Sequence, residues 1–299
     1  MSYKTLKKAK EKKNDEYYTR MVDVKEELDH YKKWFKHKII YCNCDDPEWS
    51  NFYLYFKENF KELQLEKLMS THYVSEGSSY LVEYDGVEEV RTELQGNGDF
   101  RSIECLKLMR ECDIVVTNPP FSLLRDLIDM LMEYDKKFII MGTVLGFAYS
   151  TVFPYVRTGV IKPGFTYNKN MKFYVPEGAD YEEIEEETGR KVATIGTISF
   201  FTNLNIESER EPLKLTATYS PEKYPKYDTM DFISVNKLSE IPCDYYDFMG
   251  VPVTYLGYHD PKLFYIWDLT CNAKVEGENL FKRIIIRRIK EGENPYSGF

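Results

Sequence analysis

The sequence contains no apolar run of 18 residues, and no apolar stretch follows the lysines near its start. The first absence excludes a transmembrane helix, and the second argues against a secretory signal. Cysteine and histidine are scarce. Six scattered cysteines, with Cys42 and Cys44 too close for a C-x-x-C pair, and four histidines favour neither a disulfide framework nor a zinc site. We therefore expect a cytoplasmic protein that binds no metal and, since coiled-coil heptads are missing, a monomer.

Positive charge is also in deficit, since the formal net charge is −9, and this argues against a nucleic acid as the partner. The charge is unevenly distributed, however. Residues 4–13 carry six lysines and residues 282–290 carry five basic groups, whereas acidic residues crowd into 177–187. A local basic cleft can hold DNA on an acidic protein, but solvated chain ends would give the same pattern. Composition alone leaves the partner undecided.

The first two hundred residues alternate between short apolar runs and segments with helical periodicity. This alternation predicts a parallel sheet with helices on both faces. Residues 171–175 and 192–202 are expected to close the sheet at its edge as an antiparallel pair. The expected strands are 38–42, 65–72, 80–84, 113–117 and 137–141, and the expected helices are 23–36, 51–62, 102–111, 122–134 and 147–157.

The alternation stops near residue 206, and the elements that follow are shorter, rich in tyrosine and interrupted by proline. We therefore expect two domains, an α/β domain over residues 1–205 and a smaller unit over residues 206–299. Arg283, Arg287 and Arg288 in the second unit are candidates for phosphate contact. They are equally compatible with strand residues that point to solvent.

The strongest chemical signal follows the strand 113–117, which is β-branched, unalternated and ended by Asn118-Pro119-Pro120. Ligands of open α/β sheets bind beyond the carboxyl ends of strands. The Asn118 amide oxygen and the Pro119 carbonyl would present two acceptors to one exocyclic amine, and proline adds no competing N–H. Such a pair holds the amine hydrogens out of plane and directs the nitrogen lone pair at a methyl donor. Phe121 offers a face for base stacking, or it packs in the core.

Residues 113–121 (DIVVTNPPF) resemble the catalytic motif of amino-group methyltransferases that depend on S-adenosylmethionine. Other stretches resemble adenine-specific DNA methyltransferases of the EcoRI modification type, so that the resemblance covers nearly the whole chain. These stretches are residues 15–19 (DEYYT), 44–47 (CDDP) with 49–52 (WSNF), 98–101 (GDFR) and 249–256 (MGVPVTYL).

The resemblance implies a Rossmann-like methyltransferase sheet with a C-terminal target-recognition region. It further implies transfer of a methyl group from S-adenosylmethionine to adenine N6 in double-stranded DNA, in a restriction–modification system or by an orphan enzyme, with the target base flipped out. The implied catalytic residues are Asn118, Pro119, Pro120 and Phe121. The implied cofactor residues are Tyr18, Thr19, Asp45, Ser50, Asn51, Asp99 and Phe100.

Each cofactor residue also has a purely structural interpretation. Asp45 or Asp46, and likewise Ser50 or Asn51, would be ordinary caps of the helix that follows, and Asp99 would belong to a simple turn. The glycine-rich first loop that is usual in such methyltransferases is replaced here by a polar and aromatic one, as this subfamily tends to have. The chain also departs from the pattern at Thr71-His72, where most relatives place an acid for the ribose hydroxyls.

Two rival functions remain open. The same turn would serve another amine, namely cytosine N4, an RNA adenine or a protein glutamine. A DNA-binding relative that has lost activity would keep the fold, although the intact sequence of residues 118–121 argues against such decay.

Overall fold

The computed structural model describes residues 18–293 of the chain, except 168, 176–180, 187, 196–197, 207–212, 271–272 and 281. The lysine-rich start, residues 15–17 of the DEYYT stretch and part of the acidic segment lie outside the described residues. The chain forms two compact units. The first comprises 1–152 and 163–204, and the second comprises 153–162 and 205–299.

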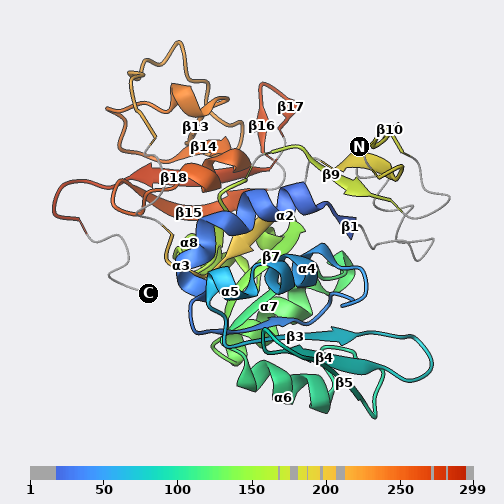
Figure 1. The fold of residues 1–299 in the computed structure, drawn as a ribbon. Helices are drawn as coiled ribbons and strands as arrows, with labels where there is room; N and C mark the ends of the chain where they lie inside the picture. The colour runs from blue at the N-terminus through green and yellow to red at the C-terminus, as the bar shows by residue number, and fades with distance from the viewer. Residues whose placement is uncertain are drawn as a thin grey trace. The chain divides into compact units, whose positions relative to one another are not determined.

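The first unit is built on an eight-stranded mixed sheet (Figure 1). Strands β3, β2, β6 and β7 are parallel to one another, whereas β4, β5 and β12 run antiparallel to their neighbours. This is the Rossmann-like α/β architecture that the alternation predicts. In spatial order the strands are β5 (Glu89–Glu93), β4 (Tyr80–Tyr84), β3 (Lys67–His72), β2 (Ile39–Cys42), β6 (Ile114–Thr117), β7 (Lys137–Thr143), β12 (Ile198–Thr202) and β8 (Lys162–Pro163).

Helices cover both faces of this sheet because the chain adds strands first on one side of β2 and then on the other. From β2 it moves to β3 on one side, and it then returns past β2 to β6 on the other. Right-handed crossovers in opposite directions place their helices on opposite faces. In Figure 1, α4 and α6 lie on either side of β3. The helices are α2 (Met21–Leu28), η1 (Asp29–Tyr31), α3 (Lys32–Phe35), α4 (Asn51–Glu58), α5 (Phe60–Leu63), α6 (Ile103–Glu111), η2 (Phe121–Leu123), α7 (Leu124–Glu133) and η3 (Gly146–Ala148).

Four expectations about single elements are wrong. The helix expected over 51–62 is divided at Asn59 into α4 and α5. The helix expected over 23–36 is divided by the 3-10 turn at 29–31, and the one expected over 147–157 consists of η3 and the short helix α8 (Phe153–Arg157). Pro154 fits the first turn of α8, where its missing N–H leaves no acceptor unsatisfied. The closing strands are also different. Strand β9 (Met171–Tyr174) pairs with β11 (Lys191–Ile195) as expected, but in a separate sheet with β1 (Tyr18–Thr19) and β10 (Glu183–Ile184).

The second unit contains a four-stranded sheet in the order β13-β14-β18-β15. Strand β15 carries a bulge between Ile266 and Asp268. Helix α8 packs on β15, which explains why residues 153–162 belong to this unit. Its elements are β13 (Ile233–Ser234), η5 (Leu238–Glu240), β14 (Met249–Pro252), η6 (Val253–Tyr258), β15 (Phe264–Thr270), β18 (Arg283–Arg288), and the pair β16 (Lys274–Val275) and β17 (Glu278–Asn279).

A buried carboxylate on α2 ties this helix to a distant turn of the first unit. Glu27 is fully buried and accepts hydrogen bonds from Tyr31 Oη (2.7 Å), from the Phe165 N–H (2.9 Å), and from the N–H and hydroxyl of Thr166 (2.7 and 2.6 Å). A Cβ at Gly164 would lie 2.1 Å from Glu27 Oε1, so only glycine allows this approach. The donors replace the water that the carboxylate loses on burial.

We expect the Glu27→Gln variant to lower the free energy of unfolding by about 2–4 kcal/mol, because its NH₂ group would face N–H and O–H donors. Glu26→Gln is the matched control, since Glu26 is exposed and its ion pair with Lys169 is worth about 0–1 kcal/mol. Urea denaturation of both variants checks this prediction, and equal losses of stability would contradict it.

Candidate active site

The strand order creates a crevice at the carboxyl end of β2. Strand β2 lies between β3 and β6, and all three are parallel, so the loops after β2 and β6 leave the sheet side by side. A reversal of strand order of this kind is where open α/β sheets bind ligands. The first loop (residues 43–46) and the turn after β6 (residues 118–120) meet there.

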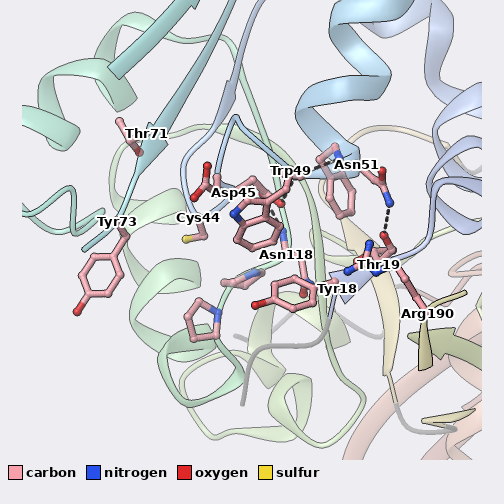
Figure 2. A pocket seen from close by; sticks show the side chains of 15 residues that line it. Tyr18, Thr19, Cys44, Asp45, Trp49, Asn51, Thr71, Tyr73, Asn118 and Arg190 are labelled. Carbon is pink, nitrogen blue, oxygen red and sulfur yellow. Dashed lines mark hydrogen bonds between the residues drawn. The ribbon is translucent and has the colours of Figure 1, made fainter. Parts of the chain in front are cut away.

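A pocket with about 790 Å³ of empty space, partly open to solvent, occupies this crevice. Figure 2 shows Thr71 and Tyr73 toward one end of the pocket and Thr19 with Arg190 toward the other, with Asp45, Trp49 and Asn118 in between. The lining residues are Tyr18, Thr19, Cys44, Asp45, Asp46, Trp49, Ser50, Asn51, Phe52, Thr71, Tyr73, Asn118, Pro119, Pro120 and Arg190.

Asp45 joins the first loop to the turn after β6. Its Oδ2 accepts from the Thr117 hydroxyl at 2.5 Å and from the Asn118 N–H at 3.1 Å, and its Oδ1 accepts from the Ser50 hydroxyl at 2.8 Å. The Cys44 N–H in turn donates to Thr117 Oγ1 at 3.1 Å. Burial raises the pKa of Asp45 to about 6, although these donors oppose the shift. The backbone at Asn118 is thus held by a carboxylate of the first loop.

The N-P-P turn itself follows the fully buried strand β6. Pro119 is buried, whereas Asn118 and Pro120 are half-buried and line the pocket. The Pro120 carbonyl accepts from the Leu123 N–H at 2.9 Å, which starts the 3-10 turn η2. Phe121 is half-buried at the start of this turn and is not among the lining residues.

The opposite wall of the pocket comes from β1, from the start of α4 and from the sheet that β1 forms with β9, β11 and β10. Thr19 is held by two contacts, because its carbonyl accepts from Asn51 Nδ2 at 2.8 Å and its hydroxyl donates to Met141 Sδ at 3.0 Å. Ser50 accepts from the Phe52 N–H at 3.1 Å and so caps α4. Ser50 therefore caps the helix, as one interpretation of the sequence expects, and it also lines the pocket.

Aromatic rings and one cation complete this wall. Tyr18 and Trp49 form an edge-to-face pair with ring centroids 4.5 Å apart. The Arg190 guanidinium lies 3.8 Å from the ring centre of Tyr174 and 5.9 Å from that of Tyr18. Stacking on Tyr174 leaves the planar N–H groups of Arg190 available at their edges, which suits a carboxylate.

Asp99 and Phe100 do not line the pocket. Arg101 donates to Asp99 from its main-chain N–H (2.8 Å), from Nε (2.9 Å) and from Nη2 (2.7 Å), and this holds the pKa of Asp99 below its ordinary value. Phe100 is buried. Gly98 fixes the turn against the end of β3, because a Cβ there would lie 2.2 Å from the His72 carbonyl oxygen.

Several lining residues were not among the predicted cofactor residues. Trp49 stands in a stretch that resembles the family, whereas Thr71 and Tyr73 lie at the carboxyl end of a parallel strand, so their positions carried a usable signal. Arg190 carried none, because only the pairing of β9 with β1 and β11 brings it to the pocket. Among the described residues, no group of three or more His, Cys, Asp or Glu side chains is arranged to hold a metal, and no helix is long and apolar enough to span a membrane.

We expect the Asp45 carboxyl to make stability depend on pH. Because its folded pKa of about 6 exceeds the unfolded value of about 3.9, the folded protein binds this proton more tightly. The free energy of unfolding of the wild type, minus that of Asp45→Asn, should therefore fall as the pH rises from about 4 through 6 and level off above 7. Urea titrations between pH 4.5 and 7.5 test this. A constant difference would contradict it.

Comparison with known proteins agrees with this arrangement. The model of the family described as adenine-specific methyltransferase EcoRI matches residues 5–296. Type II methyltransferase M.EcoRI of Escherichia coli is 39% identical over 285 residues, which cover 87% of this chain and 87% of the relative. Type II methyltransferase M.MpnI of Mycoplasma pneumoniae is 37% identical over 290 residues, covering 94% and 90%. Type II methyltransferase M.MgeORF184P of Mycoplasma genitalium is 37% identical over 274 residues, covering 89% and 86%.

No solved structure gives a significant match to the chain. The family match spans both units, from before β1 to beyond β18, and the relatives are covered over most of their own lengths. The chain therefore belongs to the EcoRI family of adenine-specific methyltransferases.

Proposed function

We propose that this protein transfers a methyl group from S-adenosylmethionine to the exocyclic N6 of adenine in double-stranded DNA. The observation that carries the proposal is that one pocket is lined both by the N-P-P turn and by the residues proposed to bind the cofactor. Asn118, Pro119 and Pro120 line the same pocket as Tyr18, Thr19, Asp45 and Ser50, so a methyl donor in this pocket would lie beside the turn that receives an amine.

The charges of the pocket fit the proposed cofactor. A zwitterionic amino-acid end needs one cation and one anion, and Arg190 and Asp45 supply them on the lining. The faces of Trp49 and Tyr18 favour a nearby cation such as a sulfonium, by roughly 0.5–2 kcal/mol. Tyr73, which is 51% exposed, offers a ring for a purine at the other end. When bound, S-adenosylmethionine supplies an electrophilic methyl group on a cationic sulfur.

The N-P-P turn would prepare the nucleophile. The Asn118 amide oxygen and the Pro119 carbonyl would accept the two N6 hydrogens and so direct the nitrogen lone pair toward the methyl group. Asp45 keeps the Asn118 main chain in place because its carboxylate accepts a 3.1 Å hydrogen bond from the Asn118 N–H. The chain would therefore contribute positioning and a fixed polar environment rather than a covalent intermediate. The target base must leave the duplex to reach this turn.

We propose that the C-terminal unit recognises the DNA target. The three arginines considered from the sequence differ in their surroundings. Arg287 forms a two-pronged ion pair with Glu293, and Arg283 donates to Asn236 Oδ1 at 3.4 Å. Arg288 lies 5.3 Å from the ring centre of Tyr246, and within the part of the chain that the structure describes no carboxylate pairs with it. Arg288 is thus the better candidate for phosphate contact.

We expect the Asn118→Ala variant to lose methyl transfer to duplex DNA by at least about 100-fold, while it binds S-adenosylhomocysteine about as well as the wild type does. The matched control is Asn170→Ala, an exposed asparagine outside the pocket lining. Initial rates with tritiated cofactor and calorimetric binding check the two halves separately. Undiminished turnover by Asn118→Ala would rule out the proposed role.

The substrate is identified by modified-base sequencing of DNA from a methylation-free bacterial host that expresses the wild type or Asn118→Ala. We expect N6-methyladenine at one short motif with the wild type alone. Methylcytosine at the motif, or methylation of RNA or protein offered in competition, would replace the adenine assignment. Soluble protein that binds S-adenosylhomocysteine but modifies none of these substrates would point to an inactive DNA-binding relative.

A further inference from the structure

The pocket contains a carboxylate, that of Asp46, close to the end of strand β3, although β3 itself ends without an acidic residue. Strand β3 ends in Thr71-His72, so no carboxylate stands at its end to receive the hydroxyls of a ribose. The structure places the carboxylate of Asp46, from the loop after β2, against this strand end. Asp46 Oδ2 lies 2.7 Å from His72 Nδ1, and Asp46 lines the pocket while His72 does not.

The His72 ring stands at one end of a stack that continues through Tyr80 and Arg91. His72 on β3 lies face to face with Tyr80 on β4, with ring centres 4.7 Å apart and an angle of 21°. The Arg91 guanidinium on β5 lies in turn over the Tyr80 ring, 3.3 Å from its centre. Glu48 accepts from the Tyr80 hydroxyl at 2.9 Å and from Arg91 Nη1 at 3.2 Å. The stack leaves His72 Nδ1 directed at Asp46.

The carboxylate of Asp46 retains capacity for a ligand. Its Oδ1 accepts from the Glu48 N–H at 2.9 Å, and its Oδ2 faces His72, so each oxygen has one further lone pair. Two vicinal hydroxyls require this arrangement, one acceptor for each O–H. Asp45 is a poorer match, because its oxygens already accept from Ser50, Thr117 and Asn118 and it is held toward β6.

We propose that Asp46 binds the ribose hydroxyls of the cofactor and that His72 is its positioning residue. This inference rests on the proposed function, since it concerns the adenosine part of S-adenosylmethionine. The adjacent Thr71 and Tyr73 also line the pocket, which places a sugar and a purine at the same end. The loop after β2 thus supplies the acid that the end of β3 lacks.

The test measures binding of S-adenosylhomocysteine and of its 2′-deoxy and 3′-deoxy forms by calorimetry. The wild type should bind at least one deoxy form about 10- to 100-fold more weakly, as expected for a lost hydrogen bond to a charged acceptor. Asp46→Ala should reduce this discrimination to about threefold or less. Glu76→Gln is the control, because it removes a charge from the exposed loop after β3, outside the pocket lining, and it should keep the discrimination of the wild type.

The outcomes separate the two proposals. If the wild type binds none of the three ligands, the proposed cofactor is wrong. If it binds them and Asp46→Ala discriminates as strongly as the wild type, the cofactor stands and the role of Asp46 is overturned. Should Asp46→Ala fail to melt cooperatively, the isosteric Asp46→Asn replaces it, and undiminished discrimination by that variant overturns the inference equally.

The positioning role of His72 has its own readout. His72→Asn keeps a donor near the position of Nδ1, whereas His72→Leu removes it. We expect His72→Leu to lower the discrimination between hydroxyl and deoxy ligands several-fold and His72→Asn to restore most of it. A merely structural role would change the melting temperature of both variants and leave the discrimination intact, which would overturn the assignment of His72.

Discussion

A buried carboxylate shared by two loops is the interaction on which the site depends. Asp45 belongs to the loop after β2, yet two of its three donors, the Thr117 hydroxyl and the Asn118 N–H, belong to the end of β6. Its third donor, Ser50, is the cap of α4. One side chain therefore sets the positions of the loop after β2, the N-P-P turn and the start of α4 relative to one another. The desolvation that raises its pKa is the energetic consequence of placing a charge at this junction.

The strand order explains why such a junction exists. Strand β2 has parallel neighbours on both sides, so loops that are far apart in sequence leave the sheet at adjacent points. The local signals of the sequence were strong enough to predict this region. The β-branched run before Asn118 has no helical alternative, and the two prolines after it end the strand. Of the predicted cofactor residues, Tyr18, Thr19, Asp45, Ser50 and Asn51 lie on the pocket that this turn borders.

What the sequence did not reveal depends on pairing over long distances. Residues 171–175 and 192–202 have the composition of strands, but composition does not specify the sheet that a strand joins. Strand β11 pairs with β9 and β12 pairs with β7, so the segment 192–202 serves two sheets. Arg190 reaches the pocket only through the first of these pairings. Asp99 shows the opposite case, since a turn with the expected residues directs its carboxylate to Arg101.

The pairing of β1 with β9 has a consequence for how the protein matures during synthesis. Tyr18 and Thr19 leave the ribosome early, but their partners Tyr174 and Phe173 are added only after all the parallel strands of the sheet. At usual rates of translation this delay is on the order of ten seconds. Until then the parallel core can assemble around β2 and β6 with one side of the pocket open. The wall of the pocket that β1 forms with β9 therefore cannot be completed in a nascent chain until residues 171–174 have been added.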